Sequence, residues 1–220
     1  MAETGPTLTR RERKIATQQA ILDAAITAFA RQGYDGTNFR DITALSGAKR
    51  ALILYYYKNK EALWKKSVQT VSDRFSHLMS QQLKEREHKL QDDSDEAQVR
   101  MALNAFLDTL EQVPEFGQIL LREGTTEGPR LDWLAKHASP PSAIGFRLKN
   151  KELNRRINRT VLRDILSSTL ISIITLAPLL DASLAAALRT KNAGINPLSK
   201  KRKAELVEHM VALALSDLTQ

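Results

Sequence analysis

Lysine, arginine and tyrosine side chains are concentrated between Lys49 and Lys60, in the stretch KRALILYYYKNK. Arginine can form a paired hydrogen bond with O6 and N7 of guanine, whereas lysine and tyrosine can donate hydrogen bonds to phosphate oxygens. Lys49 and Arg50 are therefore candidates for reading bases. The nearby tyrosines, Lys58 and Lys60 are candidates for holding a phosphate backbone.

Two short helices are needed to position these side chains. Asn38 or Thr37 can cap the first helix, because either side chain can accept a hydrogen bond from an exposed backbone N–H. Asp41 follows three residues after Asn38, where a carboxylate favours a helix N-terminus. The apolar residues of this helix recur at helical spacing and are predicted to form its inner face: Phe39, Ile42 and Leu45.

A turn at residues 46–48 separates the two helices. Gly47 stands where a helix C-terminus favours a residue tolerant of positive φ. A second helix is predicted to begin near Lys49, with Ile53 and Tyr57 on its buried face because they lie four residues apart. The pattern fits a helix-turn-helix, whose second helix reads bases in the major groove with its N-terminal residues. The turn alone fits an αα-hairpin in a helical core equally well.

The sequence on both sides of this turn resembles the TetR family of bacterial transcription regulators, from Gln19 to Leu63. The matching residues are Ile21, Leu22, Asp23, Ala24, Ala25, Phe29, Gly33, Tyr34, Gly36, Thr37, Asp41, Ile42, Gly47 and the run from Tyr56 to Leu63. They match in order and spacing over about 50 residues, which makes a chance match improbable.

The resemblance implies which residues contact DNA. Those at the family's contact positions are Arg40, Lys49, Arg50, Leu52, Tyr55, Tyr56 and Lys60. Thr37, Asn38 and Ala51, at the starts of the two helices, complete the predicted DNA-binding set. Two residues depart from the family pattern: Leu54 stands where many members have a phosphate-binding tyrosine, and Ala51 where many have glycine. Tyr55 could supply the hydroxyl that Leu54 lacks.

The same resemblance implies an all-α protein with two domains. Residues 1–11 would be a flexible arm, 12–60 a three-helix helix-turn-helix domain, and 61–220 a helical effector-binding and dimerisation domain. The expected function is a homodimeric regulator, more often a repressor, that binds double-stranded operator DNA and is released by a small-molecule effector. The basic residues that begin at Arg10 fit either a minor-groove contact or a solvated helix start.

Charge is unevenly distributed along the chain. Residues 1–75 carry a net charge of +6 out of the chain's +8. A basic N-terminal third attracts phosphates, whereas an even distribution would indicate little beyond solubility. The asymmetry therefore favours nucleic acid as the partner of the helix-turn-helix.

Composition also excludes several classes of protein. The chain has no cysteine, so it has neither disulfides nor a thiolate nucleophile. The N-terminus lacks the apolar run of a secretory signal, and the apolar stretch 165–180 is too short and too polar for a membrane span. We expect a cytoplasmic protein without a membrane partner.

Further helices are predicted from apolar periodicity and from breaks at proline and glycine. Their ranges are 12–32, 60–90, 96–112, 115–122, 128–137, 148–176, 181–189 and 199–218. The helices at 148–176 and 199–218 have the largest apolar faces, and the resemblance places the dimer contact there. The predicted interface residues are Ile165, Leu166, Thr169, Leu170, Ile173, Val207, Met210, Val211, Ala214 and Leu218. The alternative is that these faces form the core of a monomer.

The effector pocket would lie on the middle helices, where polar or aromatic side chains interrupt apolar ones. The candidates are Phe106, Phe116, Arg122, Glu123, Trp133 and His137. The four histidines lack paired metal-ligand spacing, and there is no serine elbow, paired-carboxylate motif or dinucleotide fingerprint. We therefore expect no metal, no cofactor and no enzymatic activity. The competing hypotheses are a non-specific structural DNA-binding protein and a small-molecule carrier or enzyme that uses the C-terminal body.

Overall fold

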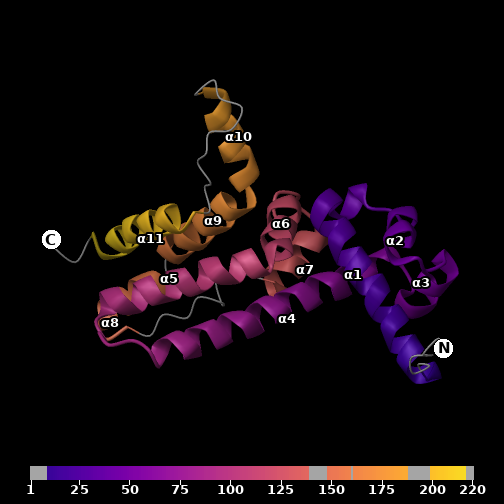
Figure 1. The fold of residues 1–220 in the computed structure, drawn as a ribbon, viewed down its shortest axis with the longest axis horizontal. Coiled ribbons are helices and arrows are strands. Elements are labelled where there is room, and N and C mark those ends of the chain that lie inside the picture. The colour runs from indigo at the N-terminus through magenta and orange to yellow at the C-terminus, as the bar shows by residue number, and fades with distance from the viewer. Residues whose placement is uncertain (1–8, 139–147, 160, 188–198, 217–220) are drawn as a thin grey trace, which may run out of the picture. The chain divides into compact units, whose positions relative to one another are not determined.

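The computed structural model describes residues 9–138, 148–159, 161–187 and 199–216, and these residues form helices without any strand (Figure 1). The N-terminal helices are α1 (Arg10–Gly36), α2 (Phe39–Ser46), α3 (Arg50–Tyr57) and α4 (Lys60–Glu87). The middle helices are α5 (Asp95–Gln112), α6 (Pro114–Glu123) and α7 (Pro129–His137). The C-terminal helices are α8 (Lys151–Arg159), α9 (Val161–Thr175), α10 (Ala177–Ala187) and α11 (Lys200–Leu215). The all-α fold class is confirmed.

The chain divides into two compact units. The first, which we call the head, contains residues 1–72 and 118–137, and the second, the body, contains 73–117 and 138–220. Helices α4 and α6 each begin in one unit and end in the other. The head therefore contains the predicted helix-turn-helix together with α7 and the second half of α6.

Helix α1 owes its position to one buried face. Thr9 and Glu12 form a capping box at its start, and the first buried residue is Ile21. Ile15 is 57% exposed, because it lies before Ile21, the first buried residue of α1. The core of the head comprises Ile21, Phe29, Ile42, Ile53, Leu63, Trp64, Val68 and Leu134.

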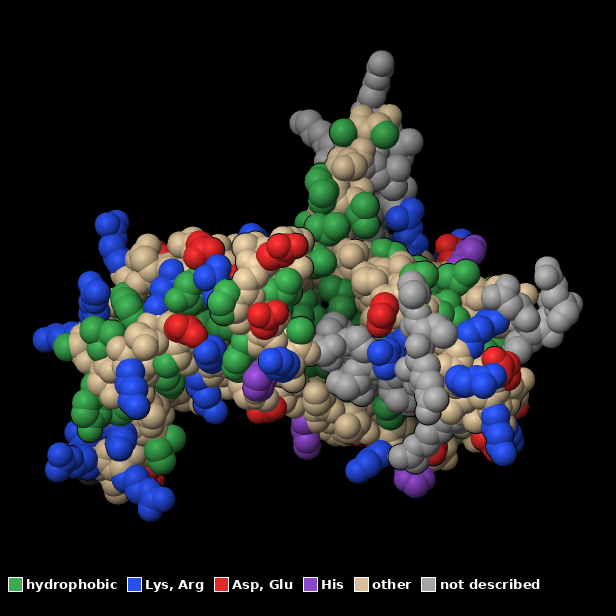
Figure 2. Space-filling view, turned by 180° about the vertical axis from the view of Figure 1, so that it is seen from behind, with side chains coloured by type: hydrophobic (Ala, Val, Ile, Leu, Met, Phe, Trp, Pro, Cys, Tyr) green, Lys and Arg blue, Asp and Glu red, His purple; other side chains and the backbone are tan. Residues whose placement is uncertain are grey.

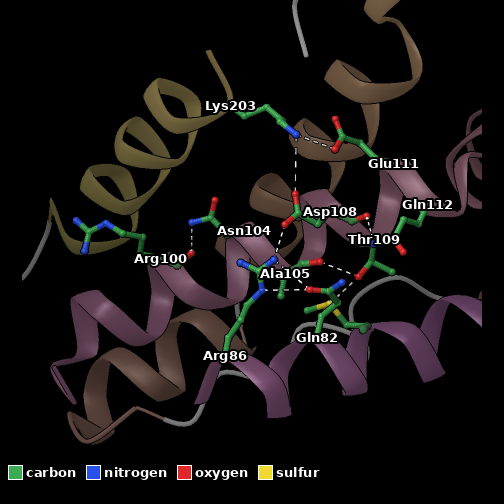
Figure 3. A network of polar contacts seen from close by, with 11 residues as sticks. Gln82, Arg86, Arg100, Asn104, Ala105, Asp108, Thr109, Glu111, Gln112 and Lys203 are labelled. Atoms are coloured by element: carbon green, nitrogen blue, oxygen red, sulfur yellow. Dashed lines mark hydrogen bonds and ion pairs between the residues drawn. The ribbon is translucent and has the colours of Figure 1, made fainter. Parts of the chain in front are cut away.

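The body is built around α5, which packs against α9 and α11. Ser94 caps α5, and Phe75, Phe106 and Phe116 form an aromatic cluster in its core, with the Phe75 and Phe116 rings stacked at 4.0 Å. A polar network on the partly exposed side joins α4, α5 and α11 (Figure 3). Arg86 pairs with Asp108, and Lys203 lies 2.7 Å from Glu111 and 3.9 Å from Asp108.

The segment predicted as one helix over 148–176 contains two helices, α8 and α9. Pro178 lies in the first turn of α10, where its missing N–H costs no helical hydrogen bond. No single helix in the described ranges is long and apolar enough to cross a membrane. The segments Leu162–Thr175 and Ala177–Ser183 are together long and apolar enough to cross a membrane, but a bend of 65° separates them.

Six of the ten predicted interface residues lie inside the core of a single chain. They are Leu166, Leu170, Val207, Met210, Val211 and Ala214, each less than 5% exposed. A side chain already covered by its own chain offers no surface to a partner, so this part of the prediction is corrected: these residues hold α9 and α11 against α5. Ile165 is exposed, Thr169 and Ile173 are half-buried, and Leu218 lies outside the described residues.

The close contact between α6 and α9 gives a first prediction. A methyl group on Gly117 would lie 2.5 Å from Thr175 Oγ1, far inside van der Waals contact. Gly117→Ala should lower the free energy of unfolding by about 1–2 kcal/mol, because overpacking outweighs the ~1 kcal/mol gain in helix propensity. Urea denaturation measures this change. Adding Thr175→Ala removes the clashing atom and should restore most of the loss; equal stability of Gly117→Ala and wild type would show that α6 and α9 are free to separate.

Candidate nucleic-acid interface

The turn between α2 and α3 has the geometry that the sequence predicts. Asn38 caps α2, its Oδ1 accepting the N–H groups of Arg40 and Asp41, while the Asp41 carboxylate accepts the Asn38 N–H at 2.9 Å. Gly47 follows the helix with φ 69°, and Lys49 is the N-cap of α3. The capping box and the positive φ of Gly47 therefore fix the two ends of α2, whereas Lys49 begins α3 without a side-chain cap hydrogen bond.

One face of α3 is anchored to the rest of the head. Ile53 is fully buried, and the Tyr57 hydroxyl donates to the backbone carbonyl of Gln18 at 3.0 Å. Burial raises the pKa of Tyr57, so its hydroxyl keeps the proton that this bond requires. Leu45, predicted to face inward from α2, is instead 53% exposed, because it lies in the last turn of an eight-residue helix whose buried residue is Ile42.

The other face of α3 is open to solvent. Its exposed or half-exposed residues are Lys49, Arg50, Ala51, Leu52, Leu54, Tyr55 and Tyr56. Tyr55 is 73% exposed and its ring packs edge-on against that of Tyr56 at 5.1 Å. An exposed large aromatic pair beside exposed cations is the surface expected of a helix that enters a groove of DNA.

Three cations line an open groove at the N-terminus of α2. The groove has a volume of about 490 Å³, and its lining residues are Thr37, Asn38, Phe39, Arg40, Thr43, Arg50 and Lys60. Two of the cations are held over aromatic rings: the Arg50 guanidinium lies 5.3 Å from the Phe39 ring centre, and Lys60 Nζ lies 4.4 Å from that of Tyr34. Lys and Arg side chains gather over the head at the left of Figure 2.

Thr37, which was predicted to contact DNA, has a buried side chain. It is 1% exposed, and its hydroxyl donates to the Gly33 carbonyl at 2.7 Å. Its side chain therefore serves the junction between α1 and α2, and the prediction that it contacts DNA is corrected on this ground. The structure brings the other nine predicted residues to the surface of α2, α3 and the start of α4.

A strained turn joins α3 to α4 and was not anticipated. Lys58 has φ 61° and ψ −58°, and the Asn59 N–H donates to the Tyr57 carbonyl at 2.6 Å, which makes a three-residue γ-turn. No other non-glycine residue in the described part of the chain has positive φ. Strain of this kind is often found at functional sites, and here it holds an exposed lysine directly after α3.

Lys58→Gly tests this strain. Relief of about 1–3 kcal/mol of backbone strain, less 0.5–1 kcal/mol for the flexibility of glycine, should raise the free energy of unfolding by about 1 kcal/mol. If Lys58 binds a phosphate, the same change should weaken binding to every DNA sequence and reduce the dependence on salt by about one phosphate contact. Lys58→Ala is the control: it removes the charge but keeps the backbone strain, so it separates the effect on DNA binding from the effect on stability.

The predicted effector residues are divided between the two units. Phe106 and Phe116 are buried in the aromatic cluster of the body. Arg122, Trp133 and His137 belong to the head, where Trp133 lies 5.4 Å from Trp64 and the His137 ring stacks on Trp133 at 4.3 Å. Among the residues that the structure describes, no group of acidic or histidine side chains is arranged to hold a metal.

Comparison with known proteins agrees with this geometry. Residues 21–66 match the model of the bacterial regulatory proteins of the tetR family. The chain is 44% identical over 55 residues to the biofilm-operon HTH-type negative transcriptional regulator IcaR of Staphylococcus epidermidis. That match covers 25% of this chain and 30% of the relative, so the chain spans less than a third of the length of the regulator it matches.

Solved structures share the fold over most of the chain. A TetR-like transcriptional regulator from Rhodococcus sp. RHA1 is 19% identical, with a TM-score of 0.55, 96% of this chain covered and 100% of the other. The transcriptional regulator FadR from Bacillus subtilis, solved with stearoyl-CoA, is 15% identical, with a TM-score of 0.59 and coverages of 90% and 98%. At these low sequence identities, the likeness concerns the fold alone.

Proposed function

We propose that the protein is a homodimeric, sequence-specific transcriptional repressor, because residues 21–66 match the model of the tetR family of bacterial regulatory proteins. The observation that carries the proposal is the exposed face of α3, which presents Arg50, Tyr55 and Tyr56 beside a groove lined by further cations. The protein would act in the cytoplasm on double-stranded operator DNA.

Two kinds of contact would hold the operator. Lys49 and Arg50, at the start of α3, would reach base edges in the major groove. Arg40, Lys60 and the amide of Asn38 surround the groove at the N-terminus of α2 and would bind the phosphate backbone, where the helix dipole adds to the attraction. Leu52, Tyr55 and Tyr56 would supply apolar and hydroxyl contacts along the same face.

The dimer face would be the outer side of α9, α10 and α11. In the described part of the body, the large hydrophobic side chains that remain exposed all lie on these helices or in the turn between α9 and α10: Ile165, Leu176, Leu179, Leu180 and Leu213. Hydrophobic side chains are exposed over α10, at the top of Figure 2. Ile165 and Thr169 lie four residues apart on one side of α9, so a second copy could cover this side by two-fold symmetry.

A small-molecule effector would act through the body. Helices α4 and α6 pass from the body into the head, so a ligand that favours one packing of the body core also favours one position of these two helices. Phe75 of α4 and Phe116 of α6 stack in the aromatic cluster of the body, so a ligand that changes the packing of this cluster would act on both helices. Effector binding would thereby change the spacing of the two heads and release the operator.

Recovery of bound fragments from sheared bacterial genomic DNA tests the function. A repressor should enrich a few fragments that share a two-fold symmetric sequence, with affinity at least about a thousandfold above that for random DNA at the same salt concentration. Equal displacement by random DNA would identify a non-specific structural protein instead. A body that binds small molecules while the full chain ignores every DNA would identify a carrier or an enzyme.

A further inference from the structure

The bend near the end of α1 determines where the helix-turn-helix begins. Gly33 has φ 71° and ψ 177°, values that no residue within a regular helix adopts. Four residues later the chain contacts this bend again: the Thr37 N–H and hydroxyl both donate to the Gly33 carbonyl, at 3.2 and 2.7 Å. Asn38 then caps α2. The geometry of Gly33 therefore sets the start of α2 and, through the following turn, the direction of α3.

Two consecutive residues of α6 bind the backbone groups on either side of this bend. In an unbroken helix the Tyr34 N–H would donate to the Ala30 carbonyl. Here the Tyr34 N–H donates to Glu123 Oε1 at 2.6 Å, and the Ala30 carbonyl accepts from Arg122 Nε at 2.9 Å. Arg122 and Glu123 thus take the places of the donor and the acceptor that the bend separates.

The contact is tight and partly enclosed. Glu123 is 8% exposed, and a methyl group on Gly33 would lie 3.2 Å from its Oε1. Arg130, from α7, lies 3.7 Å from the other Glu123 oxygen, forms an ion pair of 2.7 Å with Asp35 and stacks over the Tyr34 ring at 4.3 Å. A buried carboxylate without these partners would be destabilised by the loss of hydration. Glu123 is therefore most stable in the position where it accepts the Tyr34 N–H.

We propose that Arg122 and Glu123 are positioning residues that hold the recognition helix in its DNA-binding orientation by fixing the bend at Gly33. This inference rests on the proposed function of the head as a DNA reader. Because α6 begins in the body at Pro114, withdrawal of its C-terminal end is the step by which a change in the body releases the bend. The head that reads DNA therefore includes residues 118–137 as well as the helix-turn-helix.

The test compares operator affinity of Glu123→Ala and Arg122→Ala with that of wild type, in the full-length dimer. Loss of one charged hydrogen bond at the bend should weaken operator binding about tenfold or more, because it lets the head populate other orientations. Binding to random DNA should change less than twofold, since phosphate contacts tolerate reorientation. Glu123→Gln keeps an acceptor oxygen and should recover part of the affinity. Glu127→Ala, exposed in the segment after α6, is the matched control and should bind as wild type.

Two further readouts separate positioning from mere stability. Both tryptophans of the chain, Trp64 and Trp133, lie beside the bend, with Trp64 edge-on to Tyr34 at 5.9 Å. Glu123→Ala should shift the tryptophan emission at a temperature well below the midpoint of thermal unfolding, where the variant remains folded by circular dichroism. Wild-type operator affinity in both alanine variants would overturn the inference and leave the function intact. A wild-type protein without sequence preference would overturn the function itself.

Discussion

Replacing Arg50 by alanine is expected to reduce affinity for the operator about 5- to 150-fold while leaving affinity for random DNA nearly unchanged. A paired arginine contact with guanine contributes about 1–3 kcal/mol of discrimination, and this range of fold-changes is its equivalent. Arg50 stands exposed in the first turn of α3, and its stacking on Phe39 holds the guanidinium in one region of space. Titrations of both DNAs at one salt concentration measure the two affinities.

Lys60→Ala is the matched control for this prediction. Lys60 lines the same groove but stands at the start of α4, over the Tyr34 ring. As a phosphate ligand it should weaken binding to every sequence alike and reduce the slope of log affinity against log salt by about one. If Arg50→Ala instead behaves as Lys60→Ala does, Arg50 binds phosphate and the bases are read by other residues of α3.

Features set by neighbouring residues could be predicted from the sequence. Asn38 and Asp41 lie three residues apart, and the capping box they form depends on nothing beyond that spacing. Gly47 likewise adopts the positive φ that its place after α2 requires. The local pattern therefore predicted the start and the end of α2, whereas the burial of Thr37 and the exposure of Leu45 differ from the prediction.

Features set by distant residues could not be predicted in this way. The Glu123 bond to Tyr34 spans 89 positions of the sequence, and the Arg122 bond to Ala30 spans 92. Both α6 residues were predicted to line an effector pocket, because they are polar side chains among apolar ones on a middle helix, and this pattern fits an interhelical contact equally well. The strain at Lys58 also left no signal, since a γ-turn has no strong residue preference apart from glycine.

The residues of the proposed dimer face could also not be identified from the sequence alone. Helix α9 is apolar on most sides, so periodicity could not separate the residues that pack on α5 from those that face outward. Leu166 and Leu170 lie on the inner side and Ile165 on the outer side, one position away. The sequence therefore predicted which helices carry large apolar faces, while burial in the folded chain was needed to identify the outward residues.

Leu213→Asp is expected to convert the dimer into monomers at concentrations where the wild type is paired. Leu213 is 48% exposed on α11, and two-fold symmetry places the substitution in the interface twice. Burying two unpaired carboxylates costs several kcal/mol, so the dissociation constant of the dimer should rise at least about a thousandfold. Sedimentation velocity measures the change, and Ile165→Asp should act in the same direction.

Two controls distinguish this interface from the core and from any other exposed apolar residue. Leu170→Asp, from the set predicted by sequence, should unfold the body because Leu170 is fully buried within one chain. Ile15→Asp, at an exposed position of α1 in the head, should leave the protein dimeric. Operator affinity of Leu213→Asp should fall with dimerisation, because a monomer occupies one half-site and loses the contacts of the second head. A folded, fully dimeric Leu213→Asp protein would move the interface away from α11, and dimer formation would then depend on α9 and α10 alone.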